Sequence, residues 1–243
     1  MKTFVINLDR RQDRLEYMKK HLEFHDIPDF ERISAVDYKD FVSLDENNQE
    51  YIDYEKINKT DLLEKIKTRQ DFYLDGIMDQ IFSIPNEDKR MTISEACVAK
   101  SHQKAWKEAM NYDYSLILED DITFTSKMPP LLNYIENELN INFDIFLLGW
   151  ATQHGPKLSN ADIAFSPYTL LKIDSALLLH AYIITKNMAK QLYDATFFGP
   201  VDEYLSDLYS SINCYGIYAA SQTETHLTDN IHFSDLKNPR LVI

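Results

Sequence analysis

YSLILEDDITF, residues 114–124, is an apolar run that ends in three consecutive carboxylates, Glu119, Asp120 and Asp121. The apolar part is typical of a buried strand, and side chains alternate along a strand. We therefore expect Glu119 and Asp121 on one face and Asp120 on the other, unless the chain turns there. Carboxylates this close resist joint ionisation unless a cation compensates them, and a divalent metal is the usual compensation. The alternative is a solvated acidic turn, and the spacing alone does not separate the two.

Apolar runs and amphipathic segments alternate on both sides of this stretch. We expect strands at residues 3–8, 30–36, 143–150 and 215–220, and a strand pair within residues 162–185. The spacing of apolar residues predicts helices at residues 11–24, 94–110, 129–139, 187–195 and 201–212. This alternation predicts an α/β fold with a mainly parallel central sheet flanked by helices. Ligands bind such sheets at the carboxyl ends of the strands, and the acidic cluster lies at one of these ends.

The chain has 243 residues and a formal net charge of −14, with 25 Lys and Arg against 39 Asp and Glu. This balance excludes a general binder of nucleic acids or anionic membranes, whose affinity comes from clustered Lys and Arg. The length suits a single domain, with a polar, aperiodic insertion or lid at about residues 40–90. The sequence has no apolar run near the roughly 20 residues of a membrane span, and its N-terminus lacks a secretory signal. We therefore expect a cytoplasmic protein.

Glycine and cysteine usage excludes several kinds of site. The five glycines fall in neither GxGxxG nor GxxxxGK[ST], so a nucleotide here is not held by a glycine-rich phosphate loop. Cys97 and Cys214 lack a CxxC pair or an accompanying histidine pair, which argues against structural zinc and a disulfide framework. We expect both cysteines to be buried free thiols.

Three arginines, Arg10, Arg11 and Arg14, cluster after the first predicted strand in NLDRRQDR, residues 7–14. In an acidic chain they form a local positive site. Such a site suits an anionic ligand, which guanidinium groups and free N–H groups at a helix start can hold. The alternative is an ordinary basic helix surface, with the arginines paired to neighbouring carboxylates of the same segment.

Ser101 and His102 lie in the middle of a predicted helix, in SEACVAKSHQKAW, residues 94–106. Neither residue belongs to a GxSxG nucleophile motif, so the sequence does not support a hydrolase triad. A packed histidine in the protein core is the alternative to a role in ligand binding.

Carboxylates recur in two later segments. Asp202 and Glu203 begin a predicted helix in PVDEYL, residues 200–205, where the helix dipole alone favours acidic side chains. Asp229 lies in the tail segment TETHLTDN, where it is either a metal ligand or part of a solvated loop.

Taken in order, these motifs resemble glycosyltransferase family 25, which includes bacterial lipooligosaccharide galactosyltransferases and collagen galactosyltransferases. The resemblance is carried by FVINLDRRQDR (4–14), ISAVD (33–37), SEACVAKSHQKAW (94–106), LILEDDITF (116–124), HAYIIT (180–185) and PVDEYL (200–205). Ala96 and Tyr38 depart from the family, which usually has glycine at both positions. Residues 40–90 have no clear family counterpart, so the acceptor stays open.

The resemblance implies a GT-A type fold and a UDP-sugar donor, commonly carrying galactose, with inverting transfer to a hydroxyl of a glycan or glycoconjugate. It implies Mn²⁺ or Mg²⁺ at the acidic cluster, where the metal neutralises charge on the leaving UDP. The expected metal ligands are Glu119, Asp121 and Asp229. The expected donor-binding residues are Asn7, Arg10, Arg11, Arg14, Ser101, His102 and Asp120. Such an enzyme is expected in the cytoplasm, and at the membrane periphery where glycolipid acceptors are made.

Inverting transfer also needs a general base near the acceptor hydroxyl. Asp202 is the first candidate because it lies on a segment separate from the metal ligands, and Glu203 is the second. Two other functions stay open, a metal-dependent phosphoesterase and a catalytically inactive carbohydrate-binding relative. A phosphoesterase usually needs ligands for two metals, and the sequence offers no second dense cluster of His and Asp.

Overall fold

The fold is seen in a computed structural model, which describes residues 1–27, 29–62, 64, 66–67, 92–124, 128–151, 157–158, 163–165, 168–218 and 228–230. In these residues the central sheet has nine strands, in the order β10-β11-β14-β8-β12-β6-β1-β2, with β9 paired to β11. Their bounds are β1 (Lys2–Asn7), β2 (Phe30–Ser34), β6 (Tyr114–Glu119), β8 (Ile145–Ala151), β9 (Lys157–Leu158), β10 (Ile163–Phe165), β11 (Tyr168–Ser175), β12 (Leu177–Thr185) and β14 (Cys214–Tyr218).

Most strands at the centre of this sheet share one direction. β1 pairs in parallel with β2 and β6, and β14 pairs in parallel with β8. β12 runs against both of its neighbours, β6 and β8. Strands β2, β1, β6, β8 and β14 therefore point the same way, with β12 inserted between them. This confirms the predicted α/β class with a mainly parallel central sheet.

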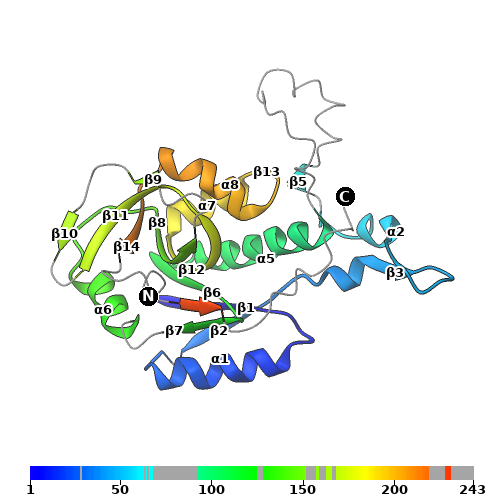
Figure 1. Cartoon of the computed structure of the whole chain (residues 1–243), viewed down its shortest axis with the longest axis horizontal. Helices are drawn as coiled ribbons and strands as arrows, with labels where there is room; N and C mark the ends of the chain where they lie inside the picture. Colours follow the sequence, from blue (N-terminus) through cyan, green and yellow to red (C-terminus); the bar gives the residue numbers. More distant parts are fainter. Residues whose placement is uncertain are drawn as a thin grey trace.

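Helices cover both faces of the sheet (Figure 1). One face carries α1 (Gln12–Phe24) and α6 (Met128–Asn137), and the other carries α5 (Ile93–Ala109), α7 (Lys186–Asp194) and α8 (Val201–Leu208). These helices match the predicted segments to within a few residues. Both cysteines are buried and free, as expected. Within the described residues, none of the helices has the length and apolar character needed to cross a membrane.

The two faces bury separate apolar cores, because alternate residues of a strand point to opposite sides. In β1, Val5 shares a core with Met18 and Leu22 of α1, whereas Phe4 shares the opposite core with Trp106 of α5. All five side chains are fully buried. Burying a side chain of this size contributes about 1.5–3 kcal/mol, so the two cores fix how α1 and α5 sit over the ends of β1 and β6.

A capping box fixes the start of α5. The hydroxyl of Thr92 accepts a 3.2 Å hydrogen bond from the backbone N–H of Glu95, and the carboxylate of Glu95 accepts a 2.6 Å bond from the backbone N–H of Thr92. Two N–H groups at the helix start are thereby satisfied, and such a cap is worth about 1 kcal/mol. The cap sets the start of the helix at Ile93. His102 lies about two and a half turns further along the helix, and its position over the sheet therefore depends on this start.

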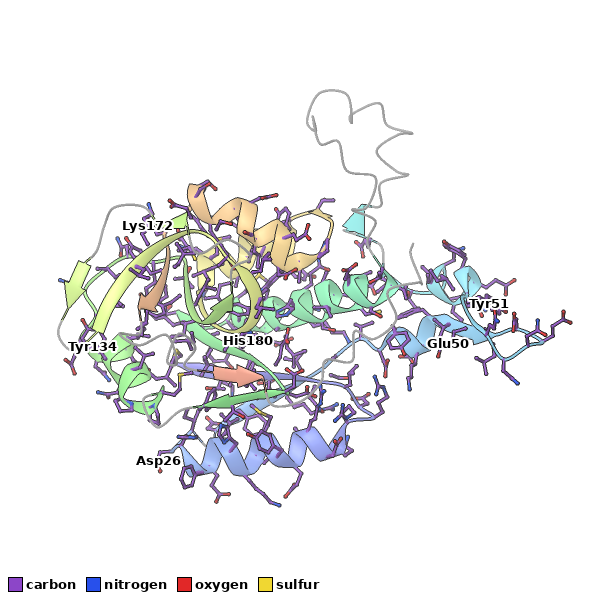
Figure 2. All side chains as sticks on the ribbon, viewed as in Figure 1. Asp26, Glu50, Tyr51, Tyr134, Lys172 and His180 are labelled. Carbon is purple, nitrogen blue, oxygen red and sulfur yellow. The ribbon has the colours of Figure 1, made fainter. Side chains whose placement is uncertain are left out.

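Part of the predicted insertion lies within the described residues. It forms η1 (Tyr38–Phe41), the antiparallel hairpin of β3 (Val42–Leu44) and β4 (Glu50–Ile52), and α2 (Tyr54–Ile57), while β5 (Ile66–Lys67) pairs with β13 (Phe197–Phe198). Figure 2 shows Glu50 and Tyr51 on this hairpin, away from the central sheet. A small core that includes Phe41, Ile57 and Cys97 anchors it to α5. Residues 68–91 lie outside the described part, so a lid there stays a prediction.

Candidate active site

The acidic cluster lies at the carboxyl ends of two neighbouring strands. β1 and β6 run in parallel with Ile6 opposite Glu119, so Asn7 and Asp120 are neighbours one residue further along. After Glu119 the chain turns at Asp120 and Asp121 before it enters β7 (Ile122–Phe124). The sequence-based placement of this site at a strand end is therefore confirmed.

The turn changes how the three carboxylates face. Glu119 points toward α5, where its Oε1 lies 3.2 Å from Nε2 of His102. Asp120 and Asp121 both point toward α1, where Nη1 of Arg14 lies 3.0 Å and 3.4 Å from their carboxylate oxygens. Strand alternation would group Glu119 with Asp121, but β6 ends at Glu119, so the chain turns here and the exception named in the sequence analysis applies.

Asn7 holds Asp120 in place. Its Nδ2 donates a 2.6 Å hydrogen bond to Oδ2 of Asp120 and a 3.0 Å bond to the backbone carbonyl of Arg11. Its Oδ1 accepts a 2.8 Å bond from Nε of Arg32, a residue of β2 that the sequence analysis did not single out. Because Arg14 contacts the other oxygen of Asp120, that carboxylate is bound on both sides. Asn7 and Asp120 thus shape the site from within the protein.

The three arginines of the first helix take separate positions. Arg14 is buried at 3% exposure beneath the acidic cluster. Arg10 forms an ion pair with Asp37 and lines the pocket described below. Arg11 pairs with Asp13 through two hydrogen bonds of 2.9 Å and 2.8 Å. The alternative of a paired helix surface therefore describes Arg11, whereas Arg10 and Arg14 belong to the candidate site.

Two hydroxyl groups connect α5 to the rest of the site. Oγ of Ser101 donates a 2.7 Å bond to the carbonyl of Cys97 and accepts a 2.8 Å bond from the backbone N–H of Val36. Ser101 thereby ties α5 to the segment after β2. The hydroxyl of Tyr182, on β12, lies 3.0 Å from Nδ1 of His102. Tyr182 was not predicted, because its place opposite α5 depends on the sheet order.

His180 is a third residue, after Arg32 and Tyr182, that the sequence analysis left without a role. β12 pairs with β6 so that Ala181 lies opposite Leu118, and the antiparallel register then brings His180 beside Glu119. His180 is 4% exposed, and Figure 2 shows it in the interior of the molecule. Its motif, HAYIIT, gave one signal, a polar residue within a mostly apolar strand.

The electrostatics of the cluster show an excess of negative charge. Burial and the neighbouring Glu119 raise the pKa of Asp121 to about 7, and burial also raises the pKa of Asp120. The pKa of Glu119 is lowered, because the hydrogen bond from His102 and nearby positive charge outweigh its burial. Arg14 offers one positive charge to three carboxylates. A divalent cation would therefore be stabilised at this place.

The carboxylate oxygens of the cluster fit a hard divalent metal that takes its remaining ligands from a substrate. Within the described part of the chain, no group of three or more His, Cys, Asp or Glu side chains is arranged to hold a metal ion by itself. Mg²⁺-type sites often use one or two carboxylates and complete their coordination with substrate phosphates. Glu119 and Asp121 suit such a site. Asp229, in β15 (Thr228–Asn230), pairs through its backbone with Thr123, and its side chain lies outside the described part.

A pocket of about 130 Å³ opens beside the cluster. Its lining includes the ionisable residues Arg10, Arg14, Asp37, His102, Glu119, Asp120 and Asp121. It also includes apolar residues from β1 and the residue after it, from α5 and from the segment after β2, among them Ile6, Leu8, Val36, Cys97 and Val98. The pocket therefore combines groups that suit a charged ligand with apolar surface that suits a flat or apolar group.

Asp202 and Glu203 lie apart from this pocket in the described structure. Both are in the first turn of α8, and Oδ1 of Asp202 accepts a 3.0 Å hydrogen bond from the backbone N–H of Glu203. Neither residue is among those that line the pocket in the described part of the chain. The helix-start alternative thus describes their local geometry, and the role of Asp202 as a base stays a prediction.

The class of protein follows from comparison with known families. Residues 1–205 match the model of glycosyltransferase family 25, described as "LPS biosynthesis protein". The chain therefore belongs to glycosyltransferase family 25, and the expected membership is confirmed.

Individual proteins show more distant likeness. Procollagen galactosyltransferase 1-B of Xenopus laevis is 29% identical over 219 residues, which cover 85% of this chain and 30% of that protein. The chain thus spans less than a third of the length of this relative. Among solved structures, a Bacillus anthracis protein described as a glucose-1-phosphate thymidylyltransferase in complex with a sucrose aligns with a TM-score of 0.38 and 12% identity. That alignment covers 90% of this chain and 87% of the other.

Proposed function

We propose that this chain transfers a sugar, galactose in the first instance, from a UDP-sugar to a hydroxyl of a glycan or glycoconjugate, with inversion at the anomeric carbon. The observation that carries the proposal is the under-compensated carboxylate cluster at the end of β6, beside a pocket lined by both charged and apolar residues, in a chain of family 25. The relative from Xenopus laevis, a procollagen galactosyltransferase by name, supports galactose as the first donor to test.

Glu119 and Asp121 are the residues proposed to hold Mn²⁺ or Mg²⁺, with Asp229 as the third candidate. When bound, such a metal neutralises the charge that develops on the leaving diphosphate. Arg14 and Asn7 hold Asp120 and thereby fix the turn that presents Asp121. A cation at this turn would also offset the burial and the repulsion from Glu119 that raise the pKa of Asp121.

The residues that line the pocket support the proposed binding of the diphosphate and the nucleobase of the UDP-sugar. Arg10, which is paired with Asp37, also lines the pocket, and a diphosphate is attracted to a guanidinium group. The apolar wall, which includes Val36 and Val98, suits the flat face of a nucleobase. Ser101 supports this wall indirectly, because its hydroxyl fixes the backbone of Val36 against α5.

Asp202 is the proposed general base, with Glu203 as the second candidate. α8 packs against β12 and α5, the elements that also carry Tyr182 and His102, so its first turn belongs to the same side of the sheet. A base on this helix is separate from the metal-holding turn, as an inverting displacement requires.

The decisive experiment is the release of UDP from several UDP-sugars in the presence of Mn²⁺, with and without glycan acceptors. A transferase releases UDP faster with its acceptor present and needs the divalent ion. A phosphoesterase would instead cleave phosphate esters without a sugar donor, and an inactive binding relative would release no UDP from any donor. Asp121→Ala is the matched variant, and full activity in this variant or in excess chelator would contradict the proposed site.

A further inference from the structure

A buried chain of hydrogen bonds ends at Glu119. Nε1 of Trp106 donates a 2.8 Å bond to the hydroxyl of Tyr182, and this hydroxyl lies 3.0 Å from Nδ1 of His102. Nε2 of His102 in turn lies 3.2 Å from Oε1 of Glu119. Trp106 and Tyr182 are fully buried and His102 is 1% exposed. The chain of bonds thus joins α5, β12 and the end of β6, and its Trp106, Tyr182 and His102 members are shielded from water.

The chemistry of the four groups fixes where each proton lies. Indole N–H is a donor only, so the oxygen of Tyr182 must accept from Trp106. Burial raises the pKa of Tyr182 well above its ordinary value, so its hydroxyl keeps a proton and donates it to Nδ1 of His102. An imidazole that accepts at Nδ1 carries its proton on Nε2 and donates to Glu119. The other tautomer would leave the tyrosine proton without an acceptor and turn a lone pair toward a carboxylate.

We propose that Trp106, Tyr182 and His102 form a positioning relay that locks His102 in the Nε2–H tautomer and thereby holds the carboxylate of Glu119 for a divalent cation. The inference rests on the proposed function in one respect, the assignment of Glu119 to the metal. Only Oε1 of Glu119 is held by the relay, and within the described residues Oε2 has no hydrogen bond. The hydrogen bond to Oε1 therefore orients the carboxylate and leaves Oε2 available to a cation.

Such outer partners matter to metal sites because they set the direction and basicity of the ligand. Removing them typically weakens metal binding by about 10–100-fold. The relay comes from elements other than the acidic turn itself, so its loss should change Glu119 and leave the contacts of Arg14 with Asp120 and Asp121 intact.

The first test is the tautomer of His102 in the metal-free protein, read from the ¹⁵N chemical shifts of its imidazole. The His102 signals are assigned by their absence in His102→Gln. In the wild type we expect an unprotonated Nδ1 and a protonated Nε2. Tyr182→Phe should shift His102 toward the other tautomer or a mixture of both. Tyr209→Phe is the matched control, because Tyr209 is also fully buried in the same core but takes no part in the relay.

The second test is Mn²⁺ binding in the presence of UDP, followed by the electron paramagnetic resonance of free Mn²⁺. Tyr182→Phe should bind Mn²⁺ about 10-fold more weakly or worse, and Tyr209→Phe should match the wild type. His102→Gln keeps one donor and one acceptor and should retain more affinity than His102→Leu. These two variants also test the relay if Tyr182→Phe does not fold.

The outcomes separate the relay from the proposed function. An Nδ1–H tautomer in the wild type overturns the relay, and so does a Tyr182→Phe protein with unchanged tautomer and Mn²⁺ affinity. Equal affinities in His102→Gln and His102→Leu also overturn it. A chain that shows the expected tautomer and Mn²⁺ responses but transfers no sugar retains the relay and loses the proposed function.

Discussion

Nδ2 of Asn7 and Oδ2 of Asp120 are 2.6 Å apart, although 113 residues separate them in the sequence. The contact joins the ends of β1 and β6 at the point where the chain leaves the sheet. Both side chains are buried, and Asn7 is 1% exposed. The acidic turn is therefore fixed by a neighbouring strand, and its geometry depends on the first residues of the chain as much as on the acidic segment itself.

Asn7→Leu should lower the free energy of unfolding by about 2–4 kcal/mol. The change removes the Asn7 amide, which bonds both to the buried Asp120 and to the partly exposed Arg32. Urea denaturation followed by circular dichroism measures the change. Asn140→Ala, at an exposed position, should leave stability within about 0.5 kcal/mol of the wild type. Equal stabilities for the two variants would contradict the role given to Asn7.

Much of this fold was predictable from local pattern. Apolar runs located β1 and β6, which are buried on both faces, and helical spacing located α1 and α5, which each bury one face. The site was predictable only as a cluster at a strand end. Which partner each carboxylate takes depends on the turn after Glu119 and on β12 lying antiparallel to β6. Neither feature has a local signature, so Arg32, His180 and Tyr182 could not be assigned from sequence.

The metal-free protein should lose stability as the pH rises from about 4 to above 7 through the titration of Asp121. Its pKa is about 7 in the folded state against an ordinary 3.8, so between these values the folded state binds more protons than the unfolded state. Stability then falls with rising pH, by an amount on the order of a few kcal/mol. Thermal denaturation in chelator across this range measures the effect.

Asp121→Asn is the control for that dependence. The amide cannot ionise, so the variant should be more stable than the wild type at pH 8 in chelator and should show a flatter pH profile. Mn²⁺ at pH 8 should stabilise the wild type and have little effect on the variant, because a ligand that binds the folded state raises its stability. Identical pH profiles would remove Asp121 as the titrating group.

Arg10 and Arg11 should differ in how strongly each contributes to UDP binding, although they are adjacent in the sequence. Arg10 lines the pocket, whereas Arg11 is paired with Asp13 on the helix surface. Arg10→Ala should weaken UDP binding several-fold, and more at low salt than at high salt, because screening reduces the contribution of its charge. Arg11→Ala serves as the control and should bind UDP like the wild type. Titration calorimetry at two salt concentrations measures both, and equal losses would assign the effect to overall charge.

Asp202→Asn tests the base, which is the part of the mechanism that the pocket geometry supports least directly. The amide is nearly the same shape as the carboxylate and still accepts the hydrogen bond from the backbone N–H of Glu203, so the first turn of α8 should be preserved. If Asp202 removes the acceptor proton, the variant should bind UDP-sugar normally and lose about 100-fold or more of kcat. Glu203→Gln, one residue further along the same turn, is the matched control and should keep most of kcat. A variant of Asp202 that loses donor binding with kcat intact would make it a donor ligand, and a large loss of kcat in Glu203→Gln alone would move the base to Glu203.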